Sequence, residues 1–224
     1  NGIRIKNTAH TCSNSANMDG VFMKKRIIPL ILTALCVLTL ITGAVLAQQQ
    51  RTLADKLIRL HVVANSDSQY DQMVKLRVRD AVLDETQRWL SGADDPAAAL
   101  AEHLGEIEAA AGQTLRACGS GETVSVRLQN ELFSRRDYET FSLPSGVYRT
   151  LRVTIGDGAG HNWWCVVFPA LCMSASSDEL EQAAEAAGIT DGELRLITED
   201  GAAYKLKFRT VELFEKFREI LTGR

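Results

Sequence analysis

The hydrophobic pattern of the chain begins with an uncharged apolar run, Ile27–Ala47. Three cations, Lys24–Arg26, precede this run, and small residues end it. A positive segment, an apolar segment and a small-residue end are typical of an export signal, and cleavage after Ala47 would leave Gln48 as the new N-terminus. The run is also long enough to cross a bilayer, so an uncleaved anchor is the alternative. Both interpretations place residues 48–224 outside the cytoplasm, and the three cations favour that orientation.

The sequence therefore divides into three parts. Residues 1–22 are polar and show no periodicity, which we interpret as a disordered or over-extended N-terminus that precedes a start at Met23. Residues 23–47 form the signal peptide or membrane anchor, with membrane contact through residues 27–47 if cleavage does not occur. Residues 48–224 form the exported domain, and Gln48–Leu53 is expected to be a polar exit from the apolar segment.

The first half of the exported domain predicts one strand and two helices. Leu57–Val63 is rich in β-branched residues and predicts a strand. Ser68 and Asp71 have the spacing of a capping box, which predicts a helix that runs to about Leu90. Its expected core face consists of Met73, Leu76, Leu83 and Leu90, with Lys75, Arg79 and Asp80 on the other side. A second helix is expected to bury Leu100, Leu104, Ile107, Ala111 and Leu115, and to end at Gly119.

In the second half of the exported domain, hydrophobic residues recur with a period of two, which is typical of strands. Val124–Leu128 alternates in polarity, and Trp163–Phe168 is apolar on both sides, as expected for a strand in the middle of a covered sheet. Turn signals predict one hairpin between Tyr138–Leu143 and Gly146–Ile155 and another between Leu194–Ile197 and Tyr204–Phe208. Helices are expected at Ser177–Ala187 and around Val211–Leu221, and Gly156–Gly160 is expected to be a hairpin turn. These elements predict a single α+β domain with a mixed, largely antiparallel sheet of five to seven strands and packed helices.

Composition and net charge limit the kinds of partner expected for this chain. The chain is 46% hydrophobic and 24% charged, which is typical of a globular protein and excludes a multi-span membrane protein. Its net charge is -3, and residues 48–224 carry 20 Lys and Arg against 27 Asp and Glu, a net charge of -7. No nucleic acid is therefore expected as a partner, and binding to acidic lipids or wall polymers by charge alone is disfavoured.

The residue pattern provides no convincing catalytic or metal site, and no cofactor is expected. His61, His103 and His161 lack the spacing of metal ligands. His161 lies near Cys165, but a thiol within an apolar strand is a poor nucleophile. The exported cysteines are Cys118, Cys165 and Cys172; a disulfide between Cys165 and Cys172 and three buried thiols both remain open.

A few polar and aromatic residues are candidates for a binding surface or for structure. Trp163 and Trp164 should point to opposite faces of a regular strand, either as binding anchors or as core. Asn65–Asp67 end a strand before a helix, where their side chains could cap the helix or form a polar rim. Arg77 and Asp80 have the spacing of an ion pair. The residues alone favour binding over catalysis.

Two long segments carry a family resemblance. Leu57–Asp80 and Leu143–Met173 closely resemble stage II sporulation protein R of endospore-forming bacteria. The resemblance extends in order over about residues 23–173 and includes the apolar segment. The part of the chain that matches least well follows Ser174.

This resemblance implies a signalling protein with no enzymatic activity of its own. Members of the family are exported from the forespore into the space between the forespore and mother-cell membranes. There they activate a membrane-embedded aspartic protease, the sigma-E factor processing peptidase, which cleaves pro-sigma-E. The family offers no catalytic residues, and its motif positions give candidate receptor-contact or structural residues: His61, Asn65, Asp67, Arg77, Asp80, Asn162, Trp163, Trp164, Cys165 and Cys172. The alternative is an exported Cys- or metal-dependent hydrolase of envelope material.

Overall fold

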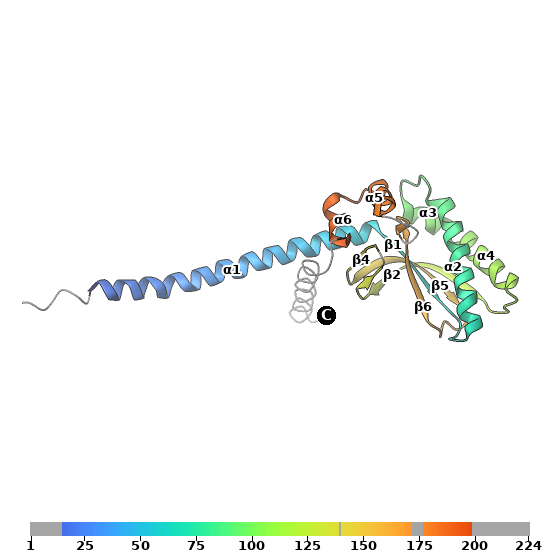
Figure 1. Cartoon of the computed structure of the whole chain (residues 1–224), viewed down its shortest axis with the longest axis horizontal. Helices are drawn as coiled ribbons and strands as arrows, with labels where there is room; N and C mark the ends of the chain where they lie inside the picture. Colours follow the sequence, from blue (N-terminus) through green and yellow to red (C-terminus); the bar gives the residue numbers. More distant parts are fainter. Residues whose placement is uncertain (1–14, 139, 172–176, 199–224) are drawn as a thin grey trace, which may run out of the picture. The chain divides into compact units, whose positions relative to one another are not determined.

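A computed structural model describes the backbone of residues 15–138, 140–171 and 177–198, and the side chains of these ranges from residue 27 onward except 177 and 196 (Figure 1). The chain divides into two compact units, residues 1–45 and 46–224, which are described separately. The second unit contains all the described strands.

Helix α1 (Ser15–Lys56) contains the apolar run and passes through Pro29. Its segment Ile27–Lys56 is long and apolar enough to cross a membrane, and only 11% of the most apolar stretch is buried. This exposure distinguishes it from the core helix of a soluble domain and is compatible with a signal or an anchor. Gln48–Leu53 was expected to be a polar exit from the apolar segment, and this prediction is wrong in one respect. The segment stays helical, and Leu53 is 1% exposed because it packs in the domain core.

The central sheet is mixed, which confirms the predicted α+β class. Its strand order is β2-β5-β1-β6; β1 runs parallel to β5, whereas β6 pairs with β1 and β2 pairs with β5 in antiparallel fashion. A small second sheet pairs β3 with β4. The strands are β1 (Ile58–Val63), β2 (Val124–Phe133), β3 (Arg136–Asp137), β4 (Ser142–Leu143), β5 (Gly146–Ile155) and β6 (Asn162–Phe168).

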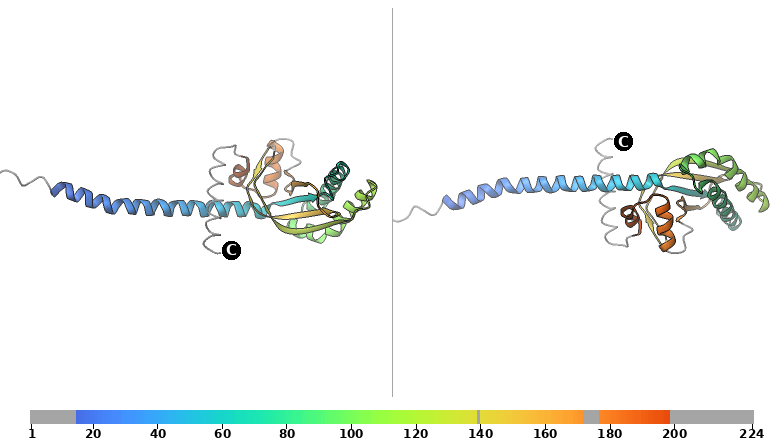
Figure 2. Two further views of the ribbon diagram at one scale, coloured as in Figure 1. Left: turned by 90° about the horizontal axis from the view of Figure 1, so that it is seen from below. Right: turned by 90° about the horizontal axis from the view of Figure 1, so that it is seen from above.

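Both faces of the sheet contribute to a hydrophobic core. On the first face, α2 (Gln69–Leu90), α3 (Pro96–Glu102) and α4 (Leu104–Ala117) pack over side chains such as Leu60 and Val62 (Figures 1 and 2). On the second face, a separate cluster joins residues of α5 (Ser177–Ala186), α6 (Asp191–Thr198) and the end of α1 to the sheet. The six residues of β1 are all buried, so β1 is the doubly covered strand.

Helix α2 begins as its sequence predicts, but only part of its predicted core face is confirmed: Leu90 is buried and Leu83 packs against the first hydrophobic cluster, whereas a valine stripe covers the sheet nearer the start of the helix. The Ser68 hydroxyl accepts a hydrogen bond from the backbone N–H of Asp71 at 3.1 Å, which confirms the N-cap. Val74, Val78 and Val82 are buried, whereas Met73 and Leu76 are 48% and 37% exposed. Both stripes repeat with helical period, so periodicity alone could not choose between them. The predicted polar position Lys75 is also buried.

The predicted second helix is divided at His103 into α3 and α4. His103 ends α3 and precedes α4, and its ring stacks on that of Trp89 with centroids 3.5 Å apart. The predicted core face is confirmed for Leu100, Ile107, Ala111 and Leu115, which are at most 1% exposed.

Several strand predictions are wrong. Tyr138–Leu143 does not pair with Gly146–Ile155; β4 pairs with β3, and β5 lies between β1 and β2. Within the described chain, Trp163–Phe168 forms the edge strand β6 and not a central one. Gly156–Gly160 is not a hairpin turn, because β1 separates the two strands that it joins. Leu194–Ile197 is helical, as part of α6. The strand and helix expected at 204–208 and 211–221 lie outside the described residues, whereas the helix expected at 177–187 is confirmed as α5.

Candidate functional site

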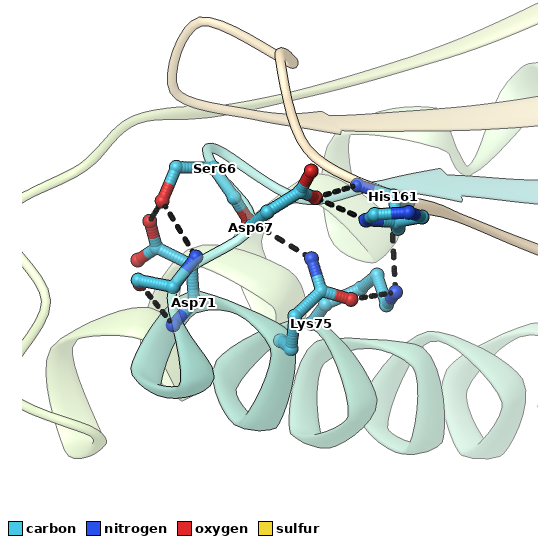
Figure 3. Close-up of polar contacts among 7 residues, drawn as sticks. Ser66, Asp67, Asp71, Lys75 and His161 are labelled. Carbon is cyan, nitrogen blue, oxygen red and sulfur yellow. Dashed lines mark hydrogen bonds and ion pairs between the residues drawn. The ribbon is translucent and has the colours of Figure 1, made fainter.

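The segment between β1 and α2 is a polar loop whose side chains bind neighbouring backbone and the first turn of α2 (Figure 3). The Ser66 hydroxyl donates to the carboxylate of Asp71 at 2.5 Å, and the Asn65 amide donates to the same carboxylate at 3.2 Å. The hydrogen bond from Ser66 lowers the pKa of Asp71 below its usual value. The loop is thus held from within, and its conformation positions Asp67.

A second loop, residues 156–161, crosses the end of β1 and lies directly against the first. Its backbone donates hydrogen bonds from Asp157 to the Asn65 side chain at 3.0 Å and from Gly160 to the carbonyl of Ala64 at 2.9 Å. A Cβ atom at Gly160 would collide with the carbonyl oxygen of Ser66, so only glycine permits this approach. The Gly156–Gly160 segment is therefore a close backbone contact between two loops.

Asp67 and His161 bring the two loops together at the surface. The Asp67 carboxylate accepts a hydrogen bond from the His161 backbone N–H at 2.6 Å and contacts the His161 ring nitrogen Nδ1 (Figure 3). The side-chain hydrogen bond with His161 is the main cause of the lowered pKa of Asp67. Both side chains remain more than half exposed, so an approaching partner can reach them.

Lys75 lies beneath this pair. Its ammonium group donates to the carbonyl of His161 at 2.9 Å and to the side-chain oxygen of Gln72 at 2.6 Å. Burial is the main cause of the lowered pKa of Lys75. The sequence placed Lys75 on a solvated helix face, but it acts as a buried connection between α2 and the start of β6.

Trp163 is accessible next to α2. The residue is 38% exposed, and the guanidinium carbon of Arg79 lies 4.4 Å from the ring centroid, within the range of a cation–π interaction. Arg79 also forms an ion pair with Asp80 at 2.6 Å. Asp80 therefore pairs with Arg79 and not with Arg77, its predicted partner. The side chain of Arg77 is exposed on α2.

The opposite face of the sheet holds a second polar group. His61 Nδ1 lies 2.7 Å from a carboxylate oxygen of Glu131, and Arg152 donates to the other oxygen at 3.1 Å. Burial would raise the pKa of Glu131, but the hydrogen bonds from His61 and Arg152 outweigh it and hold the pKa below its usual value. Trp164 stacks on His61 with centroids 5.6 Å apart, and Arg136 lies 4.0 Å over the Trp164 ring.

The structure thus places the candidate receptor-contact residues in two groups on opposite faces of the central sheet. One group lies on the side of α2, and His61 and Trp164 lie on the other side of the sheet, as the alternation of Trp163 and Trp164 requires. Residue reasoning missed the partners Glu131, Arg152, Lys75 and Gly160, because each contact joins segments distant in sequence. The period of β2 and β5 could have indicated that Glu131 and Arg152 share a face. The first group consists of Asn65, Asp67, Arg77, Asp80 and Trp163, whereas Asn162 pairs with Val63 and shares the face of His61 and Trp164.

The described residues offer little for chemistry of their own. Cys165 is 3% exposed within the first hydrophobic cluster, where desolvation opposes thiolate formation. No group of three or more metal-ligating side chains occurs among the residues that the structure describes. Cys172 lies outside them, so the disulfide between Cys165 and Cys172 stays a prediction.

Comparison with known proteins gives two matches. A family model described as stage II sporulation protein R matches residues 54–178. The curated Stage II sporulation protein R of Bacillus subtilis (strain 168) is 33% identical over 172 residues, which cover 75% of this chain and 77% of that protein. No solved structure matches the chain.

Proposed function

Because this chain belongs to the stage II sporulation protein R family, we propose that it is an exported signal that activates the membrane-embedded aspartic protease responsible for cleaving pro-sigma-E. Family membership is the observation that carries this proposal. In it, the protein is made in the forespore and acts in the space between the forespore and mother-cell membranes. It has no catalytic role of its own.

The N-terminal segment supports the proposed compartment. Three cations precede an apolar helix that is long enough to cross a bilayer, and the domain comes after it in the chain. A cationic flank favours retention of the N-terminus on the side where the chain is made, which sends the domain across the membrane. The proposal holds for a cleaved signal and for a retained anchor.

Activation by binding requires a difference in affinity. A ligand shifts a receptor toward its active conformation only if it binds that conformation more tightly, by about 1.4 kcal/mol for each tenfold change in population. The protein would therefore act stoichiometrically, and its effect would saturate with dose. A rigid domain suits this role, because a preformed surface loses little conformational entropy on binding.

The test is reconstitution in a host that does not sporulate. The full chain is expressed with the candidate protease and pro-sigma-E, and cleavage of pro-sigma-E is followed over time. We expect cleavage to depend on the protein and to rise to a plateau as its amount approaches that of the protease. Equal cleavage without the protein would refute the proposal.

Two variants separate binding from catalysis. Cys165→Ala and His161→Ala remove the residues of the hydrolase alternative, and both should retain stoichiometric activation wherever the domain remains folded. Activation of many protease molecules by one molecule of the protein, lost in either variant, would favour the hydrolase.

A further inference from the structure

One row of side chains crosses all four strands on the second face of the sheet. The register places Arg127 of β2 opposite Arg152 of β5, Arg152 beside His61 of β1, and His61 opposite Trp164 of β6. Directly paired residues share a face, so these four side chains form a continuous line. We call this row, together with Arg136 over the Trp164 ring, the arginine row.

The arginine row lies where the cover of this face ends. The neighbouring row contains Arg59, Thr150 and Val166, which are fully buried, and Arg59 and Val166 pack against the second hydrophobic cluster. By contrast, Arg127 is exposed and the Arg152 side chain is 34% exposed. The second hydrophobic cluster therefore stops covering the sheet at the arginine row, where the guanidinium groups of Arg127 and Arg152 reach solvent.

The charges of this row are unbalanced. Arg127 and Arg152 are like charges directly opposite each other on antiparallel strands, a pairing that destabilises a sheet. Glu131 forms an ion pair with Arg152, but within the described part of the chain no carboxylate pairs with Arg127 or Arg136. Three arginines thus face one carboxylate, although residues 48–224 carry a net charge of -7. A charge arrangement that destabilises the sheet and stabilises no other part of the fold is characteristic of a functional surface.

We propose that the arginine row is a docking surface for an acidic segment of a protein partner, with carboxylates that pair with Arg127 and Arg136. Arginine binds carboxylates through two parallel hydrogen bonds, and the half-buried Trp164 ring gives the partner an apolar contact at the β6 end of the row. An anionic membrane is a poorer fit, because a domain with net charge -7 is repelled by a broad negative surface. Identification of the partner as the protease rests on the proposed function.

Direct binding tests the surface itself. The full chain in neutral detergent is titrated with octaglutamate, and separately with monomeric dihexanoylphosphatidylglycerol as the lipid probe. We expect saturable binding of octaglutamate that weakens with salt, and a loss of about tenfold in affinity in Arg127→Glu and in Arg136→Gln. Arg116→Glu, which reverses an exposed charge on α4, is the matched control and should bind as the parent does.

The melting temperature distinguishes a specific loss of binding from a loss of binding through misfolding. Arg127→Glu replaces the like-charge pair with an opposite-charge pair across the strands, so the melting temperature should stay the same or rise while binding falls. Absence of octaglutamate binding, equal binding by the variants, or preference for the lipid probe would overturn the proposal. So would binding that develops only after removal of residues 199–224, which would show that the chain's own tail occupies the surface.

The reconstituted protease separates this inference from the proposed function. Pro-sigma-E cleavage that needs the protein but is unchanged in Arg127→Glu would overturn the docking surface and leave the function intact. Cleavage that is independent of the protein, with octaglutamate binding still lost in Arg127→Glu, would refute the function and retain the surface.

Discussion

The ammonium nitrogen of Lys75 lies 2.9 Å from the backbone carbonyl oxygen of His161 and joins the second turn of α2 to the residue before the edge strand β6. Because Lys75 is only 4% exposed, no water molecule can readily replace this donor. The contact holds His161 in place from below while Asp67 holds it from the side.

Lys75→Met tests the stabilising effect of this contact. The substitution keeps the apolar stem but leaves the carbonyl of His161 without its donor, so we expect the free energy of unfolding to fall by about 1–3 kcal/mol. Arg77→Met, on the exposed face of the same helix, should change it by less than about 0.5 kcal/mol. Urea unfolding of both variants measures the difference, and equal stabilities would contradict the role of Lys75.

Gly160→Ala tests the approach of the two loops. The new methyl group would collide with the backbone carbonyl of Ser66, so the loops must separate and the hydrogen bonds of that contact must weaken. We expect a loss of at least about 2 kcal/mol. Gly105→Ala is the control, because nothing lies within 4 Å of its Cβ position in α4, and it should be neutral or stabilising.

Glu131→Gln tests the electrostatics behind the arginine row. The folded state lowers the pKa of Glu131 below its unfolded value of 4.5, so its contribution to stability is fully present above pH 4.5 and is lost as the pH falls through the folded pKa. The parent should be more stable than the variant at pH 7, and the two melting temperatures should converge in acid. Glu102→Gln, at an exposed position, should follow the parent at every pH.

Leu53→Ala tests whether the domain core extends into the end of α1. Leu53 is 1% exposed in the second hydrophobic cluster, so truncation should cost about 2–5 kcal/mol. The outcome should be the same for a cleaved and an uncleaved chain, because Leu53 comes after the predicted cleavage site at Ala47. A change below about 1 kcal/mol, measured by urea unfolding, would exclude this packing.

The predicted disulfide requires a chemical test. Protein prepared without reductant is denatured, alkylated and digested; Cys118 should be modified, whereas Cys165 and Cys172 should be recovered as a linked peptide. A loop this short should contribute about 2–3 kcal/mol by restricting the unfolded chain. Alkylation of all three residues would contradict the bridge.

The sequence predicted local features well because local chemistry determines them. The Ser68 cap requires only a hydroxyl at the correct spacing from Asp71, and the opposite directions of Trp163 and Trp164 result from the pleat of a strand. Helix α5 was predicted for the same reason, from acidic and alanine residues within ten positions.

The features that the sequence did not predict depend on long-range pairing. β6 is apolar on both sides, yet it lies at the edge of the described sheet, because helices and the second cluster cover its faces without a further strand. Lys75 was assigned to solvent because its buried partner, the carbonyl of His161, is a backbone atom with no sequence signature. The segment Leu194–Ile197 has the apolar content of a strand and becomes helical under the N-terminal hydrogen bonds that Thr190 and Glu193 exchange.

The position of β1 determines when the domain can form. β1 is the first strand in the chain, but both of its neighbours come late: β5 ends at Ile155 and β6 at Phe168. As the chain emerges from its N-terminus, β1 must remain unpaired in this sheet until those segments arrive. No fragment that stops short of Phe168 contains a finished sheet or an assembled arginine row. Only a chain that extends through β6 can present the arginine row, so products that end before Phe168 lack this surface.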